Sequence, residues 1–308
     1  MYLKTLGSLG RRYKIARRHL TLKKVYNLMK IYGQYVLNQP TINTMPAFLK
    51  IEASRKCTVN CKYCQPKKEE RFFPLPVYKD IVDKLSPWVV EVSLYDIGEP
   101  LWCEELLEFI GYAHQKNMGT SISTSLSLEK PREYWGRLVL SGLDYLIVAL
   151  DGVSEEVYKK YRTNGDYQLV MQNLQAIIEA KRKHNPQLMM EWQMIEFDWN
   201  RHEIADARRM AKELGMDFKL IQEATNPRKE TQDNDEYTRT RNCLLPYLVF
   251  IVNAYGEVNP CYKYYNPHMS IGSIKENTFE DIWNNNEIHK IRDKRLIHTR
   301  QICCRCNE

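Results

Sequence analysis

Three cysteines stand close together in the sequence, at Cys57, Cys61 and Cys64. Three thiolates within eight residues can surround a metal cluster from a single short loop. Structural zinc sites usually combine two cysteine pairs into four ligands, and no fourth ligand stands nearby. A 4Fe–4S cluster held by three cysteines keeps one iron without a protein ligand, and such an iron can bind a small molecule. The spacing therefore favours an open iron–sulfur cluster over a structural zinc site.

A second group of cysteines lies towards the other end of the chain, and it consists of Cys243, Cys261, Cys303 and Cys306. Four thiolates can close a metal site completely, and their spacing also suits a zinc ion. Cys304 is a spare thiol that could exchange roles with Cys303. Cys103 stands alone in a helical segment, and we expect it to be a core residue.

The composition is that of a soluble globular protein. The chain has 308 residues, of which 44% are hydrophobic and 27% are charged, and these values exclude a disordered chain. No run approaches the ~18 apolar residues of a membrane-spanning helix, and the N-terminus lacks the pattern of a secretory signal. We therefore expect a cytoplasmic, reducing environment. There the nine cysteines are better explained as metal ligands than as disulfides.

The excess positive charge is confined to the N-terminus. Residues 1–32 contain nine lysines and arginines and no acidic residue. The remaining 276 residues hold 36 basic and 38 acidic side chains. The body of the protein is thus nearly neutral, which argues against a nucleic-acid-binding face.

The segment Thr21–Asn38 has the pattern of an amphipathic helix capped by Thr21. Its apolar positions recur at helical spacing and are Leu22, Val25, Met29, Tyr32 and Val36. We expect this helix to pack on the outside of the main domain. The alternative is a basic arm that contacts an anionic membrane surface or an acidic partner.

Strand-like and helical segments alternate from Pro46 onward. The six expected strands are Ala47–Ala53, Val89–Tyr95, Thr120–Ser125, Tyr145–Asp151, Leu188–Phe197 and Phe218–Gln222. The expected helices are Pro76–Leu85, Glu104–Lys116, Pro131–Ser141, Tyr167–His184 and Arg201–Leu214. This alternation predicts parallel strands joined by right-handed crossovers. Because six strands are too few for a closed eight-stranded barrel, we expect an open, partial (β/α)6 TIM-like barrel. Its chemistry should lie at the carboxyl ends of the strands.

The pattern changes after about residue 224. Asn226–Arg241 is typical of a linker, Leu245–Asn253 and Glu257–Cys261 predict a hairpin, and Phe279–Arg295 predicts a helix. We therefore expect three units, which are a basic arm at 1–45, the partial barrel at 46–224 and a small cysteine-containing appendage at 225–308.

The spacing C-x3-C-x-aromatic-C, with Tyr63 as the aromatic residue, resembles the signature of the radical S-adenosylmethionine (SAM) superfamily. The resemblance runs from about Ala47 to the end of the chain. It implies that Cys57, Cys61 and Cys64 ligate a 4Fe–4S cluster whose open iron binds SAM. In this family an electron donor such as flavodoxin or ferredoxin reduces the cluster, and SAM is split into methionine and a 5′-deoxyadenosyl radical. The radical then abstracts a hydrogen atom from the substrate.

Other positions resemble the SAM-binding elements of the family. Gly98, Glu99 and Pro100 follow the second strand and resemble the family's Gly-Glu-Pro element, which implies contacts with the SAM amino group. Ser123 ends the third strand and is implied as a ribose or carboxylate contact. The Asn-Gly that follows in the family is replaced here by Ser125 and Leu126.

The resemblance implies four further SAM-binding positions, which lie on or after the later strands. Asp151 lies in a stretch that resembles the family's Ser-x-Asp-Gly, without its serine. Arg162 stands where related proteins have an arginine that pairs with the SAM carboxylate, and an arginine can bind a carboxylate through two hydrogen bonds. Gln193 and Ile221 are implied as contacts with the ribose and the adenine.

The C-terminal cysteines resemble the short "twitch" form of the SPASM domain, which many radical SAM enzymes carry. This resemblance implies that Cys243, Cys261, Cys303 and Cys306 close an auxiliary 4Fe–4S cluster that passes electrons. Zinc is the alternative for these four residues.

The resemblance implies an enzyme and leaves its substrate open. Members with one auxiliary cluster include dehydrogenases that oxidise an alcohol carbon of sugars or aminocyclitols, and other members modify peptides. The N-terminal arm is too short for a peptide-recognition domain, so we favour the oxidation of a small sugar-like molecule. The alternatives are a peptide-modifying enzyme and a non-enzymatic iron–sulfur or zinc module.

A dehydrogenase also needs a group that accepts the hydroxyl proton. Tyr95, Asp151, Glu191 and Glu223 are candidates from the expected strands and the loops that follow them. A shift of one residue in strand register reverses which side chains point inward. The sequence therefore identifies no single catalytic residue.

Overall fold

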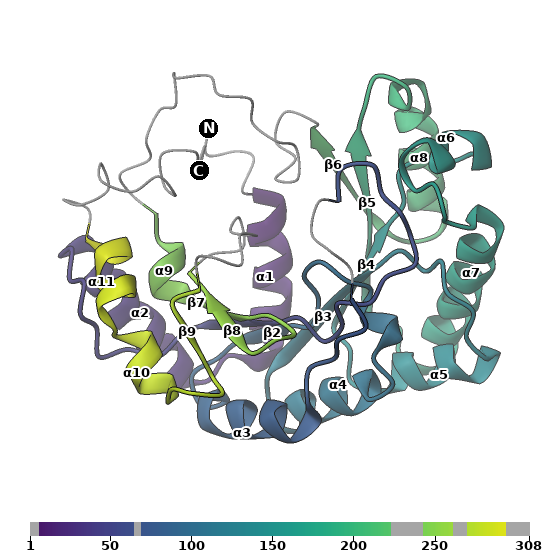
Figure 1. Cartoon of the computed structure of the whole chain (residues 1–308). Helices are drawn as coiled ribbons and strands as arrows, with labels where there is room; N and C mark the ends of the chain where they lie inside the picture. Colours follow the sequence, from purple (N-terminus) through teal and green to yellow (C-terminus); the bar gives the residue numbers. More distant parts are fainter. Residues whose placement is uncertain (1–5, 65–68, 223–242, 261–269, 294–308) are drawn as a thin grey trace.

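The protein is built around a single mixed sheet, and the barrel part of this sheet consists of six parallel strands (Figure 1). The computed structural model describes residues 6–64, 69–222, 243–260 and 270–293. The parallel strands are β1 (Phe48–Ile51), β2 (Glu91–Ser93), β3 (Gly119–Thr124), β4 (Tyr145–Ala149), β5 (Met189–Glu196) and β6 (Asp217–Gln222). They lie in the order β6-β5-β4-β3-β2-β1. The predicted α/β fold with an open, partial barrel is confirmed.

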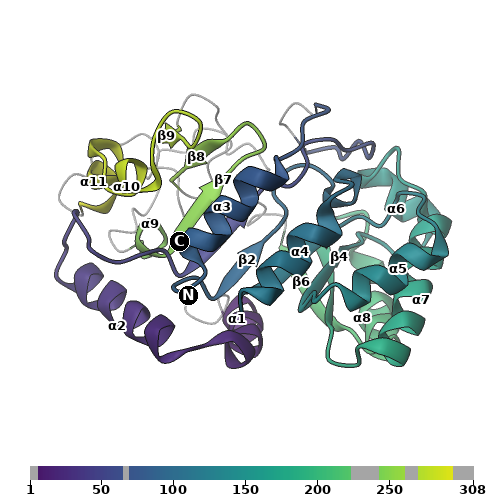
Figure 2. The same ribbon diagram turned by 90° about the horizontal axis from the view of Figure 1, so that it is seen from below.

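Helices cover the outer face of this sheet (Figures 1 and 2). They are α3 (Leu75–Leu85), η1 (Pro100–Trp102), α4 (Leu106–Gln115), α5 (Arg132–Leu140), α6 (Glu155–Tyr161), α7 (Tyr167–His184), η2 (Arg201–Glu203) and α8 (Ile204–Glu213). The strand side chains that face these helices are apolar and buried, among them Leu49, Val92, Ile122, Leu146 and Trp192. All five predicted helices are present. The seven residues of α6 are too few to give a clear helical period, and the sequence pattern did not predict it.

The inner face of the sheet carries polar side chains. The register places Lys50 beside Ser93 and Ser93 beside Ser121. Because side chains alternate between the two faces of a strand, Ser123 shares this inner face. On β5, Glu191 lies beside Ile147 of β4 and belongs to the same face. The polar interior is therefore suited to hold a ligand, whereas the outer face forms the core.

Two helices precede the barrel, α1 (Leu6–His19) and α2 (Leu22–Val36). Helix α1 packs on the inner face of the sheet, where Ile15 is fully buried beside Tyr145 and Ile147. Gly119 makes this approach possible, because a Cβ there would lie 2.2 Å from the Cγ2 atom of Ile15. The sequence pattern did not predict α1.

The predicted helix Thr21–Asn38 is confirmed, and the Thr21 hydroxyl caps it by accepting a hydrogen bond from the backbone of Lys24 at 3.3 Å. The helix packs on the outside of the body, as expected, but its apolar stripe does not face the body. Leu22 is 91% exposed, and the other four residues of the stripe are exposed as well. The helix instead buries Lys24 and Asn27, because both side chains hydrogen-bond to backbone carbonyls of the body.

The C-terminal strands extend the sheet rather than forming a separate one. Strand β7 (Val249–Val252) pairs in parallel with β1, and β8 (Glu257–Asn259) and β9 (Gly272–Ser273) follow in antiparallel pairing. The predicted hairpin is present but starts later than expected. The segment before β7 is the short helix α9 (Leu245–Leu248), because a proline in its first turn favours a helix start.

The predicted helix Phe279–Arg295 is interrupted. Its described part forms α10 (Phe279–Trp283) and α11 (Asn286–Arg292). The side chain of Asn285 accepts a hydrogen bond from a backbone N–H of α11 and caps this second helix, so the first helix ends before it. The predicted linker at 226–241 lies outside the described residues, and the unit boundaries at 45 and 224 stay predictions.

Candidate active site at the carboxyl ends of the strands

The loop after β1 carries the three predicted cluster ligands. Cys61 is buried, whereas Cys57 and Cys64 are half-buried. The backbone of Cys61 pairs with that of Arg162 as an isolated antiparallel bridge, and backbone hydrogen bonds continue on either side of it. The loop is thus fastened to the end of α6. All three thiols lie beyond the carboxyl end of the first strand, where the sequence placed them.

Aromatic and apolar side chains form a wall beside the cysteines. Tyr63, the aromatic residue of the motif, lies 5.7 Å from the ring of Phe197, which stacks on Trp199 at 4.3 Å. Ile195 and Ile221 belong to the same cluster as the three cysteines. Phe197 and Trp199 were not predicted as site residues, although aromatic residues directly after a strand end are a signal for such a wall. This wall places apolar surface beside the thiols.

The Gly-Glu-Pro element lies against the cysteine loop. A Cβ at Gly98 would come within 2.0 Å of the carbonyl oxygen of Ser54, so only glycine fits this approach. The Glu99 side chain is buried, and one of its carboxylate oxygens accepts hydrogen bonds from the backbone N–H and the hydroxyl of Ser125, at 2.8 and 2.7 Å. Pro100 starts the short helix η1. Glu99 therefore ties the loop after β2 to the end of β3, and its contact with SAM stays a prediction.

Asp151 and Arg162 form a buried ion pair directly behind the cysteine loop. Two nitrogens of the guanidinium lie 2.7 Å from one carboxylate oxygen of Asp151, and the other oxygen accepts the backbone N–H of Ile195 at 2.7 Å. The third guanidinium nitrogen points at the sulfur of Cys61 at 3.7 Å. Burial alone would lower the pKa of Arg162, but Asp151 and Cys61 raise it well above its ordinary value. A fixed positive charge therefore faces one of the cluster thiols.

The remaining predicted contacts lie on the strands. Ser123 and Gln193 are half-buried on the inner face. Glu191 is buried two residues before Gln193, and one of its carboxylate oxygens accepts the hydroxyl of Tyr145 at 3.0 Å. Within the described residues, the other oxygen of Glu191 is buried and has no hydrogen-bond partner. Glu223 lies outside the described residues. Among the proton-acceptor candidates within them, Glu191 is the acid with a buried oxygen that lacks a hydrogen-bond partner.

The other cysteines divide into two cases. Cys243 is half-buried just before α9, and Cys261, Cys303, Cys304 and Cys306 lie outside the described residues. Cys103 is a core residue, as predicted. Burial raises its pKa to about 11, so its thiol stays protonated and unreactive.

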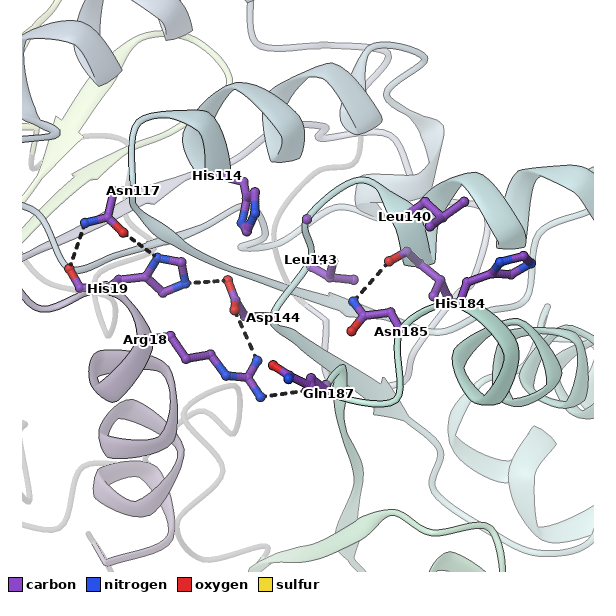
Figure 3. A pocket seen from close by; sticks show the side chains of 12 residues that line it. Arg18, His19, His114, Asn117, Leu140, Leu143, Asp144, His184, Asn185 and Gln187 are labelled. Carbon is purple, nitrogen blue, oxygen red and sulfur yellow. Dashed lines mark hydrogen bonds and ion pairs between the residues drawn. The ribbon is translucent and has the colours of Figure 1, made fainter.

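A histidine and aspartate cluster lies at the opposite end of β4 and was not anticipated (Figure 3). His19, His114 and Asp144 place their ligand atoms within 4.8 Å of one another. Both carboxylate oxygens of Asp144 already have protein partners, because one accepts from His19 and from the backbone of Thr120, and the other from Arg18. The cluster is therefore an attachment point for α1 rather than a metal centre.

Two family models match the regions that contain the two cysteine groups. A family model described as "Radical SAM superfamily" matches residues 51–190, and one described as "Iron-sulfur cluster-binding domain" (SPASM) matches residues 243–307. This chain belongs to the radical SAM superfamily. The first match begins in β1 and includes the cysteine loop, and the second includes all five C-terminal cysteines.

Two curated relatives illustrate the range of activities in this radical SAM family. An Fe-coproporphyrin III synthase of Methanosarcina barkeri is 30% identical over 39% of this chain, and the chain spans only 31% of its length. An S-adenosyl-L-methionine-dependent 2-deoxy-scyllo-inosamine dehydrogenase of Niallia circulans is 22% identical, with 80% of this chain and 85% of the relative covered.

Two solved structures share the radical SAM fold. The structure of BtrN in complex with AdoMet and 2-DOIA is 18% identical, with a TM-score of 0.55 over 87% of this chain and 95% of that chain. Streptococcus suis SuiB bound to the precursor peptide SuiA is 14% identical, with a TM-score of 0.68 over 87% of this chain and 71% of that chain. These likenesses establish the fold of the barrel.

The two family matches imply SAM and two 4Fe–4S clusters as cofactors. The described residues at the carboxyl ends of the strands fit the SAM-binding cluster. Among the described residues, Cys57, Cys61 and Cys64 do not converge within 4.8 Å as the ligands of a single metal ion would. The apolar wall and the charge of Arg162 also suit an anionic thiolate-bound cluster shielded from water.

Proposed function

We propose that this radical SAM enzyme is a dehydrogenase that oxidises an alcohol carbon of a small, sugar- or aminocyclitol-like molecule. The polar inner face of the barrel carries the proposal. Ser123 and Gln193, both half-buried, place a hydroxyl and an amide group there, and such groups match a hydroxyl-rich ligand. The extent of the match to the 2-deoxy-scyllo-inosamine dehydrogenase, 80% of this chain and 85% of that protein, supports the same reaction class.

The cysteine loop would hold the SAM-binding cluster through Cys57, Cys61 and Cys64. When bound and reduced, this cofactor supplies a 5′-deoxyadenosyl radical, which takes a hydrogen atom from a substrate carbon. Arg162 keeps a positive charge beside the Cys61 thiolate. Tyr63 and its aromatic neighbours exclude water from the reacting groups.

The SAM contacts fall into two groups. Glu99 and Asp151 are already hydrogen-bonded within the protein, so their main role is to hold the loop around Gly98 and Pro100 and the side chain of Arg162. The direct contacts that we propose from the inner face and the aromatic wall are Ser123, Gln193, Ile221 and Tyr63.

Glu191 is the proton acceptor that we propose. Oxidation of an alcohol to a ketone removes one hydrogen atom, one proton and one electron. The buried oxygen of Glu191 without a partner in the described residues can take the proton, while Tyr145 orients the carboxylate through the other oxygen. A general base positioned in this way typically contributes 10²–10⁴-fold to the rate.

The electron needs an acceptor. Cys243, Cys261, Cys303 and Cys306 would hold the auxiliary cluster, whose chemistry when bound is electron transfer. All four lie in the range that matches the iron–sulfur domain, which favours a cluster over zinc. We further propose a cytoplasmic location and a flavodoxin- or ferredoxin-like donor for the SAM-binding cluster.

The test is a substrate screen with the anaerobically reconstituted protein. Each sugar, aminocyclitol or peptide is incubated with SAM and a reductant, and deoxyadenosine is quantified. We expect a cyclic polyol to raise deoxyadenosine formation and to be recovered as a ketone. Stimulation by a peptide alone, with a changed peptide mass, would contradict the small-molecule proposal.

A peptide-modifying enzyme is the second candidate. The observation that favours it is the likeness to SuiB, whose TM-score of 0.68 exceeds that of BtrN. SuiB is the longer protein, since 71% of it is covered against 95% of BtrN. The same screen separates the two candidates.

A further inference from the structure

The N-terminal helices expose an unusual amount of apolar surface. Ten large hydrophobic side chains are exposed in the part of the chain whose side chains are described, and nine of them lie between residues 13 and 37. They are Tyr13, Leu20, Leu22, Val25, Tyr26, Met29, Tyr32, Val36 and Leu37. The tenth, Leu140, lies elsewhere, at the end of α5. We call the seven of them from Leu22 to Leu37 the α2 stripe.

The α2 stripe occupies one side of its helix. At 100° per residue, Leu22, Met29 and Val36 fall in line along the same side of α2. The opposite side buries Lys24, Asn27 and Ile31 against the body. The amphipathicity of α2 is thus the reverse of that of an ordinary surface helix, whose apolar side faces the core. Figure 2 shows α2 at the periphery of the molecule.

Hydrogen bonds hold the polar side of α2 inward. The ammonium of Lys24 donates to the backbone carbonyls of His19, at 3.1 Å, and Asn117. The amide of Asn27 donates to the carbonyl of Met45 at 2.8 Å and accepts from its N–H at 3.2 Å. Burial lowers the pKa of Lys24 to about 8. Rotating α2 to bury its stripe would break all of these bonds, so the stripe is fixed outward.

The end of α1 is attached to the body just as firmly (Figure 3). Asp144 receives Arg18 at 3.2 Å and His19 at 3.1 Å. Arg18 also donates to the backbone carbonyl of Gln187 at 2.8 Å. The connection between α1 and α2 starts at His19. The contacts of Arg18 and His19 with the body therefore fix the position of the helix that carries the α2 stripe.

Positive charge accompanies the exposed apolar surface. Residues 1–32 hold nine basic side chains, and the first acidic residue of the chain is Glu52. Of the nine, Lys24 is buried, and Lys14 and Arg18 form ion pairs with Asp217 and Asp144. Lys23 and Lys30 lie on α2 itself, about 80–100° around the helix from Leu22. The Lys23 ammonium lies 4.1 Å from the centre of the Trp88 ring, and the Lys30 ammonium lies 5.6 Å from that of the Tyr26 ring. Arg17, at the end of α1, is exposed as well. An apolar stripe edged by cations and free of acids complements an anionic lipid surface, where lysines meet headgroups and apolar side chains enter the acyl boundary.

We propose that α2 is an in-plane membrane anchor that binds this protein to anionic lipid. The helix lies parallel to the bilayer, with the α2 stripe inserted at the headgroup level and Lys23 and Lys30 among the lipid phosphates. The attachment is peripheral, because none of the described helices has the length and apolarity to cross a bilayer. The proposal is independent of the substrate of the enzyme.

Vesicle co-sedimentation of the full-length protein tests this proposal. The probes are vesicles of phosphatidylcholine alone and of phosphatidylcholine mixed with phosphatidylglycerol. We expect binding to the mixed vesicles that exceeds binding to phosphatidylcholine by more than tenfold and that weakens as salt is raised. Replacing Lys23 and Lys30 together with glutamine should reduce affinity by about fivefold for each cation removed.

A matched pair of variants isolates the stripe. Met29 and Leu140 are both 62% exposed, so Met29→Glu and Leu140→Glu change equally accessible side chains. We expect Met29→Glu to lose more than tenfold in vesicle affinity and Leu140→Glu to bind as the wild type does. Circular dichroism and thermal melting of both variants verify that the fold is retained.

Three outcomes would overturn the proposal. The first is that the wild type does not bind vesicles. The second is that Met29→Glu binds them as tightly as the wild type, and the third is that binding does not depend on anionic lipid. Light scattering in the absence of lipid measures whether a second copy of this chain, rather than a membrane, covers the stripe. A dimer that Met29→Glu dissociates would identify the stripe as an interface between two copies of this chain.

Discussion

A buried aspartate lies at each end of strand β4, and the two aspartates have different roles. Asp151 follows the strand and holds Arg162, whose guanidinium also faces the sulfur of Cys61. Asp144 precedes the strand and holds Arg18 and His19 of helix α1. The same kind of ion pair thus positions a charge for chemistry at one end and attaches a helix at the other. The partner that the arginine faces, rather than the pair itself, distinguishes a site from an attachment point.

The largest effect on activity is expected from the ligands at the Asp151 end. Replacing Cys57, Cys61 and Cys64 together by alanine should abolish deoxyadenosine formation, because no thiolate remains to hold the SAM-binding cluster. If the protein binds two clusters, about half of its iron should remain. Iron analysis and chromatography of the products measure both quantities. Deoxyadenosine at the wild-type rate would refute the assignment of this loop.

The second-largest effect on activity is expected from the ion pair between Asp151 and Arg162. The double variant Asp151→Asn with Arg162→Gln removes both charges and avoids an unpaired buried carboxylate, which would cost about 3–5 kcal/mol. We expect SAM cleavage to fall by more than tenfold, and the potential of the SAM-binding cluster to become more negative. Arg162→Lys keeps the charge and should recover part of both. If the double variant left rate and potential unchanged, Arg162 would be structural only.

The proton acceptor gives a more selective effect. Glu191→Gln preserves the size of the side chain and should lower ketone formation by about 10²-fold. Deoxyadenosine should still form, because hydrogen-atom abstraction does not need this group. Product analysis of the variant separates the two steps. Parallel loss of both products would indicate that Glu191 acts in binding instead.

The smallest effect on activity is expected at the Asp144 end. His19 and Arg18 outweigh burial and hold the pKa of Asp144 below its ordinary value of 3.8. A lowered pKa in the folded state contributes stability that is present above pH ~4 and is lost as the pH falls through the folded pKa. Asp144→Asn should remove this acid dependence and destabilise the protein by a few kcal/mol, because His19 loses a buried partner.

Denaturant unfolding between pH 3 and pH 7 measures that effect. SAM cleavage per bound cluster should remain near the wild-type value in Asp144→Asn. A loss of catalysis comparable to that of the Asp151 and Arg162 variant would erase the distinction between the two ends.

Local patterns in the sequence predict much of the fold. The six strands, their order of appearance and five of the helices follow from apolar periodicity, and Thr21 correctly marks the start of α2. The side on which α2 packs does not follow, because Lys24 is buried by the carbonyl of Asn117, 93 residues away in the chain. The pairing of β7 with β1 likewise depends on a contact between distant segments.

The candidate site divides in the same way. The three cysteines and the Gly-Glu-Pro element are short motifs whose residues lie close together in the sequence. The hydrogen bonds from Ser125 to Glu99 and the aromatic wall at Phe197 arise only when loops after different strands meet. The exposed stripe of α2 shows the limit most clearly, since the pattern that predicts a helix cannot tell an inward face from an outward one.

The central claim is that the carboxyl end of this barrel takes a hydrogen atom from an alcohol carbon. The transfer of deuterium tests this claim most directly. A polyol that the screen identifies is labelled with deuterium at the carbon that becomes the ketone, and the reconstituted protein is supplied with SAM and reductant. We predict one deuterium in deoxyadenosine and equal amounts of methionine, deoxyadenosine and ketone. Unlabelled deoxyadenosine without ketone, for every polyol tested, would contradict the account.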